Sequence, residues 1–283
     1  MFLFAPWVIL SIFSGLASNI FAYFNRALLK DKDDPVVYAW YFETLRTLIL
    51  SVVAIFDWKL IITPQSLLIF TLLGLSEWIA IYWYMKMHSH SHLSVSSIIS
   101  RTRLIWVAVL AFLIVGERLT LFEYIGIAIL FFGLSIVVAP KKLLMDKGAR
   151  YANLAAVMIA FNIVLIKLAL PYASNSVINI VIGLPSIFLF PLFMKNSYSR
   201  IRPMFEKRIW IKSLAVIINV VSILLFAAAL RVGETGKVTA IYQGMLIFSV
   251  LAGIIFLKER DNIGKKLIGT AVTLIGVLLL TVI

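Results

Sequence analysis

The sequence contains no cysteine among its 283 residues. A disulfide framework and a thiolate metal site are therefore both excluded. Charge is also scarce, because 14% of the residues are charged and 62% are hydrophobic. Soluble domains have about 25% charged and about 45–50% apolar residues. The chain has too little polar sequence to cover a water-facing surface, which indicates that it lies in a membrane almost throughout.

Common enzyme motifs are missing as well. The sequence has no GxSxG elbow, no P-loop, no HExxH pair and no glycine-rich dinucleotide fingerprint. We therefore expect neither an enzyme nor a cofactor. Acidic residues are few, with 13 Asp and Glu against 26 Lys and Arg. This excess does not indicate nucleic-acid binding, because most basic residues lie in short connections between apolar runs, where they set membrane orientation.

Apolar runs of about 20 residues fill the chain, and a helix of about this length crosses the hydrocarbon of a bilayer. They predict ten spanning helices, at 5–28, 35–56, 65–87, 93–115, 121–139, 151–170, 174–194, 210–230, 235–257 and 264–283. Only 141–150 and 195–209 have the character of loops. The predicted fold class is an all-α membrane protein with ten transmembrane helices.

An internal repeat divides these helices into two sets. "LIVGERLTLFEYIGIAILFFGL" at 113–134 and "IFLKERDNIGKKLIGTAVTLIGV" at 255–277 share one pattern. In each, an apolar helix ends in Glu-Arg and a second helix follows with glycines seven residues apart: Gly126 and Gly133, then Gly269 and Gly276. The pattern predicts five-helix halves at 1–140 and 151–283, joined by a basic linker at 141–150. An odd number of spans per half makes the two repeats inverted, as in many secondary transporters.

The basic residues predict an orientation. The side that carries the first, third, fifth, seventh and ninth loops has 18 Lys and Arg, and the other side has five. The positive-inside rule places the richer side in the cytoplasm and both termini outside.

Five charges stand out near the middle of predicted spans, at a depth of roughly 12–16 Å if each residue adds 1.5 Å. They are Glu43, Arg46, Glu77, Arg101 and Arg103. Charges in a bilayer are costly and need a reason. One interpretation is a polar binding chamber in which Arg101 or Arg103 meets an acidic group of a substrate and Glu43 or Glu77 exchanges protons. The other is a set of internal ion pairs that hold the second, third and fourth helices together.

Weaker candidates complete the site. Tyr242 and Gln243 lie in the repeat counterpart of the arginine-bearing helix, and Asn19 lies in the first helix; we expect all three to contact substrate. The amides of Asn162, Asn179 and Asn219 are expected to cross-link helices. The "HSHSH" stretch suggests a metal or pH-sensing site formed by His88, His90 and His92. That spacing brings three imidazoles together only in an extended backbone, and polar residues are expected at a helix join, so we predict no metal.

The segments "GERLTLFEYIGIAILFFGL", "KERDNIGKKLIGTAVTLIGV" and "ALRVGETGKVTAIYQGMLIFSVLAGIIFLKER" resemble the EamA-type repeat of the drug/metabolite transporter superfamily. The resemblance covers both halves. It implies a ten-helix carrier of small solutes, with both termini in the cytoplasm, in conflict with the charge distribution. The family's proline in the fourth and ninth helices is absent from "RTRLIWVAVL" and "YQGMLIFSVL". Helix 1 also lacks the glutamate that couples protons in related small multidrug transporters.

The predicted function is secondary active transport of a small organic solute, an amino acid, another metabolite or a drug, by alternating access. The alternatives are a channel or facilitator for a small solute or ion, and a non-transporting membrane scaffold or sensor. Proton coupling, if present, would use Glu43 or Glu77. The expected location is the cell (inner) membrane of a prokaryote, where lipid and the small-molecule substrate are the partners. The sequence does not determine the substrate, the coupling ion, the direction of flux or the oligomeric state.

Overall fold

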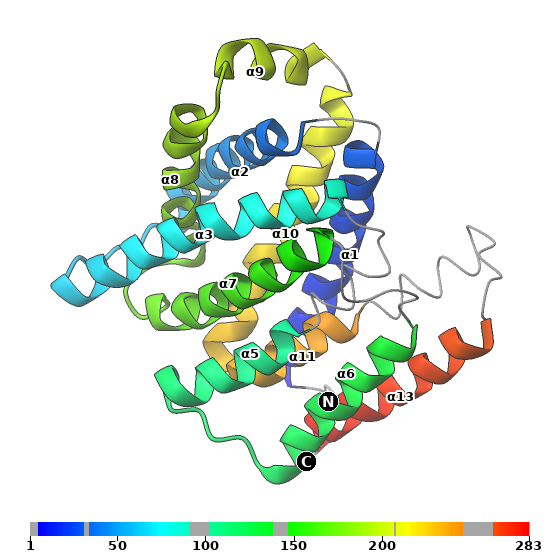
Figure 1. The fold of residues 1–283 in the computed structure, drawn as a ribbon. Coiled ribbons are helices and arrows are strands. Elements are labelled where there is room, and N and C mark those ends of the chain that lie inside the picture. The colour runs from blue at the N-terminus through cyan, green and yellow to red at the C-terminus, as the bar shows by residue number, and fades with distance from the viewer. Residues whose placement is uncertain are drawn as a thin grey trace.

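The computed structural model of the chain describes residues 5–30, 34–90, 102–137, 147–206, 208–245 and 263–282, in which every regular element is a helix (Figure 1). The first half contains α1 (Pro6–Lys30), α2 (Pro35–Asp57), α3 (Pro64–His90), α5 (Arg103–Leu110), its π-helical continuation η1 (Ala111–Val115) and α6 (Leu121–Val137). The second half contains α7 (Lys147–Ala169), α8 (Asn175–Phe193), α9 (Ser197–Glu206), α10 (Ile209–Val232), α11 (Thr235–Gly244) and α13 (Ile263–Val282).

Short polar segments start and stop these helices. Asp34 caps α2, because its Oδ1 accepts hydrogen bonds from Val36 N at 3.0 Å and Val37 N at 3.4 Å. Pro35 follows at the first helical position, where its missing N–H leaves no donor unsatisfied. Gly116 ends η1 with a φ of 77°, a left-handed conformation that glycine adopts without strain. The sequence therefore fixes helix ends through local hydrogen bonding as well as through hydropathy.

The helices confirm the all-α fold class. Within the described residues, six helical segments are long and apolar enough to cross a membrane: Pro6–Asn25, Pro35–Asp57, Pro64–Met87, Arg150–Ala169, Asn175–Phe193 and Ile209–Val232. Two shorter apolar helices cover Arg103–Val115 and Leu121–Gly133. Parts of the predicted spans at 93–115 and 235–257 lie outside the described residues. The count of ten spans therefore stays a prediction.

The prediction that 195–209 is a loop is wrong in part, because this segment contains α9. The helix buries Met204 and half-buries Ile201, three residues apart, so both meet the protein on one side. The segment is too short and too charged to register as an apolar run, and Pro203 lies inside it. Contacts with the rest of the fold decide its structure.

The packing of the helices follows the repeat. α1 packs on α10, and their counterparts in the other half, α7 and α3, also pack together. α5 packs on α7 as α11 packs on α1. The remaining pairs, α2 with α8 and α6 with α13, each join two counterparts. Each major contact between two helices is therefore either repeated between the counterparts of those helices or formed between two helices that are counterparts of each other.

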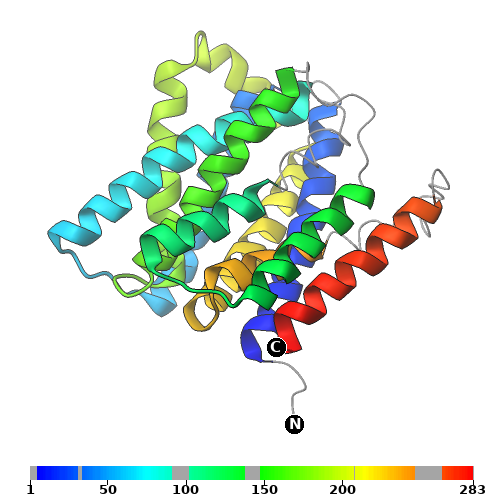
Figure 2. The ribbon, with the colours of Figure 1, turned by 60° about the horizontal axis from the view of Figure 1, so that its bottom comes forward.

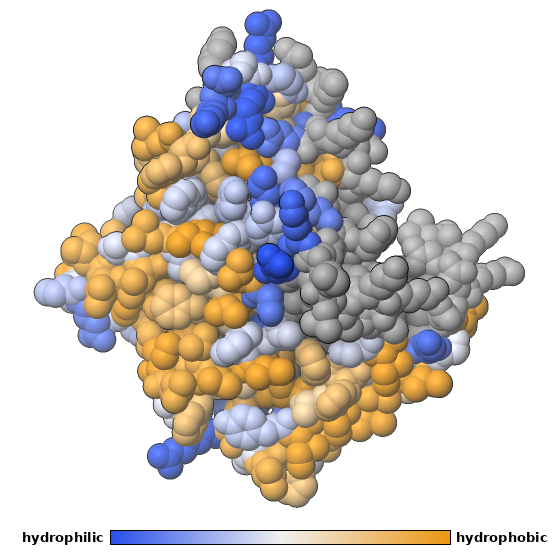
Figure 3. All heavy atoms as spheres, in the orientation of Figure 1, coloured by the Kyte–Doolittle hydropathy of each residue, from blue (hydrophilic) through white to orange (hydrophobic). Residues whose placement is uncertain are grey.

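The outer surface and the α6–α13 contact fit a lipid environment. Large apolar side chains point outward, with exposed fractions of 75% for Ile55 and 77% for Leu192, and hydrophobic residues cover much of the face in Figure 3.

α6 and α13 lie side by side (Figures 1 and 2). A Cβ added to Gly276 would lie 2.6 Å from Leu130 N and 2.8 Å from Gly126 O. Small residues of this kind let membrane helices approach backbone to backbone.

Candidate functional site

A series of buried charged groups links α2 to α3. Arg46 of α2 donates through Nη2 to Glu43 Oε2 at 2.5 Å, one helical turn back along α2. Its Nη1 lies 3.5 Å from Glu77 Oε1 on α3. Glu43 is 0% exposed and Arg46 is 4% exposed. Because each lone charge would cost about 2.5–3.5 kcal/mol in a bilayer on insertion scales, their pairing explains how all three are tolerated.

Asn162 extends this series into the second half of the chain. Its Nδ2 donates to Glu77 Oε2 at 2.5 Å, and its Oδ1 accepts a hydrogen bond from Ser76 Oγ. Glu43, Arg46, Glu77 and Asn162, hereafter the buried charge chain, therefore join α2 and α3 of the first half to α7 of the second. The amide cross-link matches the role expected for Asn162.

Several atoms of the buried charge chain and its surroundings have no partner. Within the described residues, Glu43 Oε1, Arg46 Nε and Thr47 Oγ1 are buried and make no hydrogen bond. Gly183 of α8 packs closely against them, since a Cβ there would collide with Thr47 Oγ1 and lie 3.2 Å from Glu43 Oε2. Buried polar atoms without partners are rare in proteins. These three atoms therefore carry an unmet hydrogen-bonding capacity in the tightly packed contact between α2 and α8.

Tyr242 lies at the contact between α11 and α1. Gly15 of α1 permits this contact, because a Cβ there would lie 2.5 Å from the carbonyl oxygen of Tyr242. The Tyr242 hydroxyl donates to Ser18 Oγ at 2.5 Å, and its ring packs on Phe226 with centroids 4.9 Å apart. The next residue, Gln243, is 2% exposed. Both predicted residues of this helix are thus held inside the fold.

Arg103 is the first residue of α5 and is half-buried. Its Nε is buried and has no hydrogen-bond partner within the described residues. Its charge interacts electrostatically with Tyr242 and with Tyr84 of α3. Asn19 instead donates to the carbonyl oxygen of Gly15 in its own helix, at 2.8 Å. The structure brings Arg103 near Tyr242, whereas Arg101 lies outside the described residues.

The histidine stretch is described only in part. His90 ends α3, where its Nδ1 lies 3.1 Å from the carbonyl oxygen of Lys86 and its ring meets Tyr151 edge-on at 5.6 Å. His92 and the side chain of His88 lie outside the described residues. Among the residues that are described, no three His, Asp or Glu side chains are placed to hold a metal ion.

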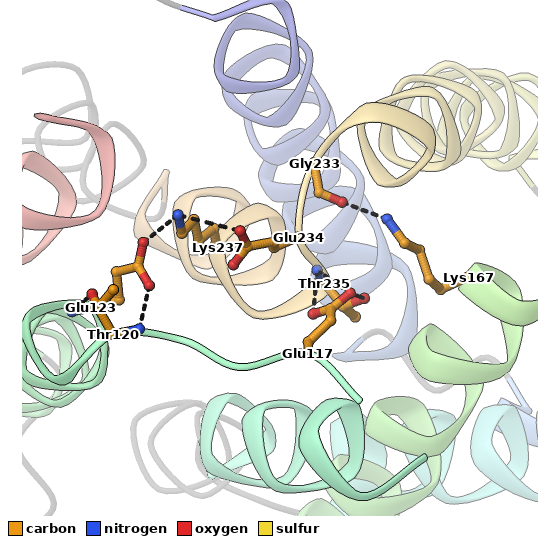
Figure 4. A network of polar contacts seen from close by, with 8 residues as sticks. All are labelled: Glu117, Thr120, Glu123, Lys167, Gly233, Glu234, Thr235 and Lys237. Carbon is orange, nitrogen blue, oxygen red and sulfur yellow. Dashed lines mark hydrogen bonds and ion pairs between the residues drawn. The ribbon is translucent and has the colours of Figure 1, made fainter. Parts of the chain in front are cut away.

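A polar network joins residues of both halves of the chain (Figure 4). Glu117, which follows η1, accepts hydrogen bonds from Thr235 N at 2.8 and 3.0 Å and from Thr235 Oγ1 at 2.6 Å. Thr235 is the first residue of α11. A carboxylate from the first half thus caps a helix of the second, where the helix dipole favours negative charge.

Two lysines complete this network. Lys237 of α11 forms ion pairs with Glu123 of α6 and, at 3.5 Å, with Glu234. Lys167 of α7 donates to the carbonyl oxygens of Leu230 at 2.5 Å and Gly233 at 2.6 Å, where α10 ends. The end-face network is the set formed by Glu117, Glu123, Lys167, Glu234, Thr235 and Lys237. It fastens α5 and α6 to α7, α10 and α11.

A pocket of about 280 Å³ opens beside this network. Its lining includes Trp7, Lys167, Arg231, Glu234 and Lys237. In the sequence, Glu117 is marked only by its place in the repeated Glu-Arg pair, and no motif identifies Lys167, Thr235 or Lys237 as its companions. The available signal was their position, because each lies at an end of an apolar run on the side opposite the basic loops.

Replacement of Glu117 by alanine should lower the free energy of unfolding by about 1 kcal/mol, the usual loss when a helix cap is removed. The N–H of Thr235 then loses its acceptor. Denaturation in detergent micelles measures the change. Arg118→Ala is the matched control, since Arg118 is the exposed neighbour of Glu117. Equal losses in both variants would show that the cap adds nothing.

Comparisons with known proteins give a family and a fold. A model of the EamA-like transporter family matches residues 5–139 and 146–282. No curated protein matches the chain, whereas 28 chains of solved structures do. One of these, described only as "Crystal structure of protein", aligns with 97% of this chain and 98% of its own length, with a TM-score of 0.72 and 12% identity. At this identity the likeness is one of fold alone.

Proposed function

Because the chain belongs to the EamA-like transporter family, we propose that it is a secondary transporter that moves a small organic solute by alternating access. Membership confirms the resemblance to the drug/metabolite transporter superfamily, and with the apolar helices it identifies a multi-pass membrane protein. An amino acid, another metabolite or a drug is the proposed cargo. The proposed location is the inner membrane of a prokaryote, and no catalytic step is part of the mechanism.

The observation that carries this proposal is the matched packing of helices between the two halves. Counterpart helices occupy counterpart contacts, α1 with α10 and α7 with α3. This supports ten spans arranged as two inverted repeats. Inverted repeats give a transporter two related conformations, one open to each side, with the substrate site near the midplane between the repeats.

The proposed substrate contacts lie on α1, α5 and α11. Arg103 would bind an acidic group of the substrate, because its buried Nε has no partner within the described residues. Arg101 is a second candidate for this role. Tyr242 and Gln243 would add polar contacts. Asn19 would add another after breaking its hydrogen bond to the carbonyl oxygen of Gly15.

Glu43 and Glu77 are the proposed coupling groups. Both share Arg46, so a proton gained by one of them changes the charge balance of the whole buried charge chain. Because this chain joins both halves through Asn162, a change there acts on the contact between repeats. The two glutamates are therefore placed to link protonation to a change of conformation.

The end-face network is the proposed closed gate of this state. Each of its hydrogen bonds involves a charged group and contributes about 1.5–3 kcal/mol net, since water replaces the partner when the bond opens. The ion pair of Lys237 with Glu123 is mostly shielded from water, whereas Glu234 is exposed and its pair with Lys237 contributes less. In the proposed mechanism, the free energy of substrate binding offsets the free energy needed to open this network.

A ligand screen tests the binding site. A substrate present at about 100 times its dissociation constant should stabilise the detergent-purified protein by about 3 kcal/mol, seen as a raised melting temperature. We expect Arg103→Gln to remove this shift and Arg118→Gln, an exposed charge loss, to keep it. A hit that Arg103→Gln binds as tightly as the native protein would remove Arg103 from the site.

Flux measurements in proteoliposomes separate the three candidate functions. Saturable uptake that speeds up when unlabelled substrate is present on the opposite side supports the carrier. Conductance without saturation would indicate a channel or facilitator. Absence of flux for every ligand that binds would indicate a scaffold or sensor.

A further inference from the structure

α9 is set apart from the spanning helices by its two ends. Asn196 precedes it with a φ of 53° and Arg208 follows it with a φ of 52°. Left-handed residues of this kind turn the chain sharply, and a bulky side chain adopts them only where the surroundings require it. Figure 1 shows α9 lying across the top of the molecule between the ends of α8 and α10.

The inner side of α9 is fastened to the protein. Arg200 forms a salt bridge with Asp34, with Nη2 at 2.6 Å and Nε at 2.8 Å from Oδ2. The buried Lys212 donates from Nζ to the carbonyl oxygen of Met204 at 3.1 Å. Phe205 meets the ring of Tyr41 edge-on, with centroids 5.7 Å apart. These contacts fix which face of α9 points outward.

The outer side combines positive charge with apolar rings. Lys195, Arg202 and Arg208 are exposed, whereas Arg200 is paired with Asp34 and Lys212 is buried. The adjoining rings of Phe193 and Trp210 are 72% and 84% exposed. Hydrophilic residues gather at the top of Figure 3, where Figure 1 places α9. Basic side chains beside aromatic rings are typical of a helix that lies in the interface of a bilayer.

We propose that α9 lies in the headgroup layer and binds anionic phospholipids of the surrounding bilayer. The exposed rings of Phe193 and Trp210 enter the boundary with the acyl chains, and Lys195 and Arg202 meet the phosphate charges. Lipid is the partner because these basic side chains complement phosphate charge at the depth where α8 ends and α10 begins. The proposal is independent of the transported solute.

Retained lipid tests the charge selectivity. Native mass spectrometry compares phosphatidylglycerol with phosphatidylcholine carried by protein from mixed micelles. The native protein should retain phosphatidylglycerol preferentially, and Lys195→Gln/Arg202→Gln should lower that preference about fivefold or more. The control pair Lys59→Gln/Arg118→Gln removes two exposed charges at the opposite end and should keep the preference. Equal retention of both lipids by the native protein, or equal loss in both pairs, would overturn the proposal.

A spin label tests the depth. Since the chain has no cysteine, Ser199→Cys gives a unique attachment point on α9. In vesicles of phosphatidylcholine with phosphatidylglycerol, the label should show the collision rates with oxygen and with a nickel chelate that are typical of headgroups. Rates equal to those of a label in bulk water would overturn the placement of α9 in the membrane.

Discussion

Arg46→Met should lower the free energy of unfolding by about 4 kcal/mol, because it removes one partner of a buried ion pair and leaves the other uncompensated. Arg46 is the only cation paired with Glu43 and Glu77 within the described residues. Glu43 is fully buried on α2 and would lose the cation paired with it, so its carboxyl group would be left buried without compensation. Reversible unfolding in mixed micelles measures the loss.

A compensating change sharpens this prediction. Glu43→Gln in the same chain removes the stranded charge, so the double variant should recover most of the loss. Arg118→Met, at an exposed position, should change little. If Arg46→Met unfolds no more easily than Arg118→Met, the buried charge chain does not hold α2 and α3 together.

The second large effect is expected at the contact between α6 and α13. Gly276→Val should destabilise the protein by about 3 kcal/mol, the upper range for overpacking a tight contact. A Cβ at this position would lie 2.6 Å from Leu130 N. Main-chain atoms cannot rotate away as a flexible side chain can, so the helices must separate. The midpoint of denaturation in detergent gives the size of the effect.

Gly264→Val is the matched control, because it makes the same substitution in the same helix. A Cβ at Gly264 would meet nothing within 4 Å. We expect a loss of less than about 1 kcal/mol there, from helix propensity alone. Comparable losses at both positions would mean that close approach of α6 and α13 does not matter for stability.

Sequence reasoning located the apolar helices because membrane helices follow hydropathy closely, but it missed α9. That helix depends on contacts distant in sequence, such as Arg200 with Asp34. Depth along the predicted spans placed Glu43, Arg46 and Glu77 in one layer, and the structure joins all three. Arg103 has the same estimated depth but forms no ion pair within the described residues. The depth of a residue in the bilayer follows from its position along a predicted span. The direction in which its side chain points depends on how the helices pack, which the sequence alone does not give.

The seven-residue glycine spacing predicted a repeat but not its physical purpose. Gly133 and Gly276 lie in different halves, and each meets the backbone of the other half's final helix. Sequence alone does not say that two equivalent helices pack on each other. It could equally place the glycines against a different neighbour.

The same contact has a mechanical consequence. Since α6 and α13 touch backbone to backbone at Gly133 and Gly276, they are expected to move as one rigid body rather than slide past each other. α6 is tied to η1 through 116–120, which begins at Gly116, a residue with room for a Cβ but a backbone that only glycine adopts easily. Any rotation of the bundle relative to this body must concentrate its bending in such connections. We therefore expect Gly116, at one edge of the end-face network, to absorb part of that bending.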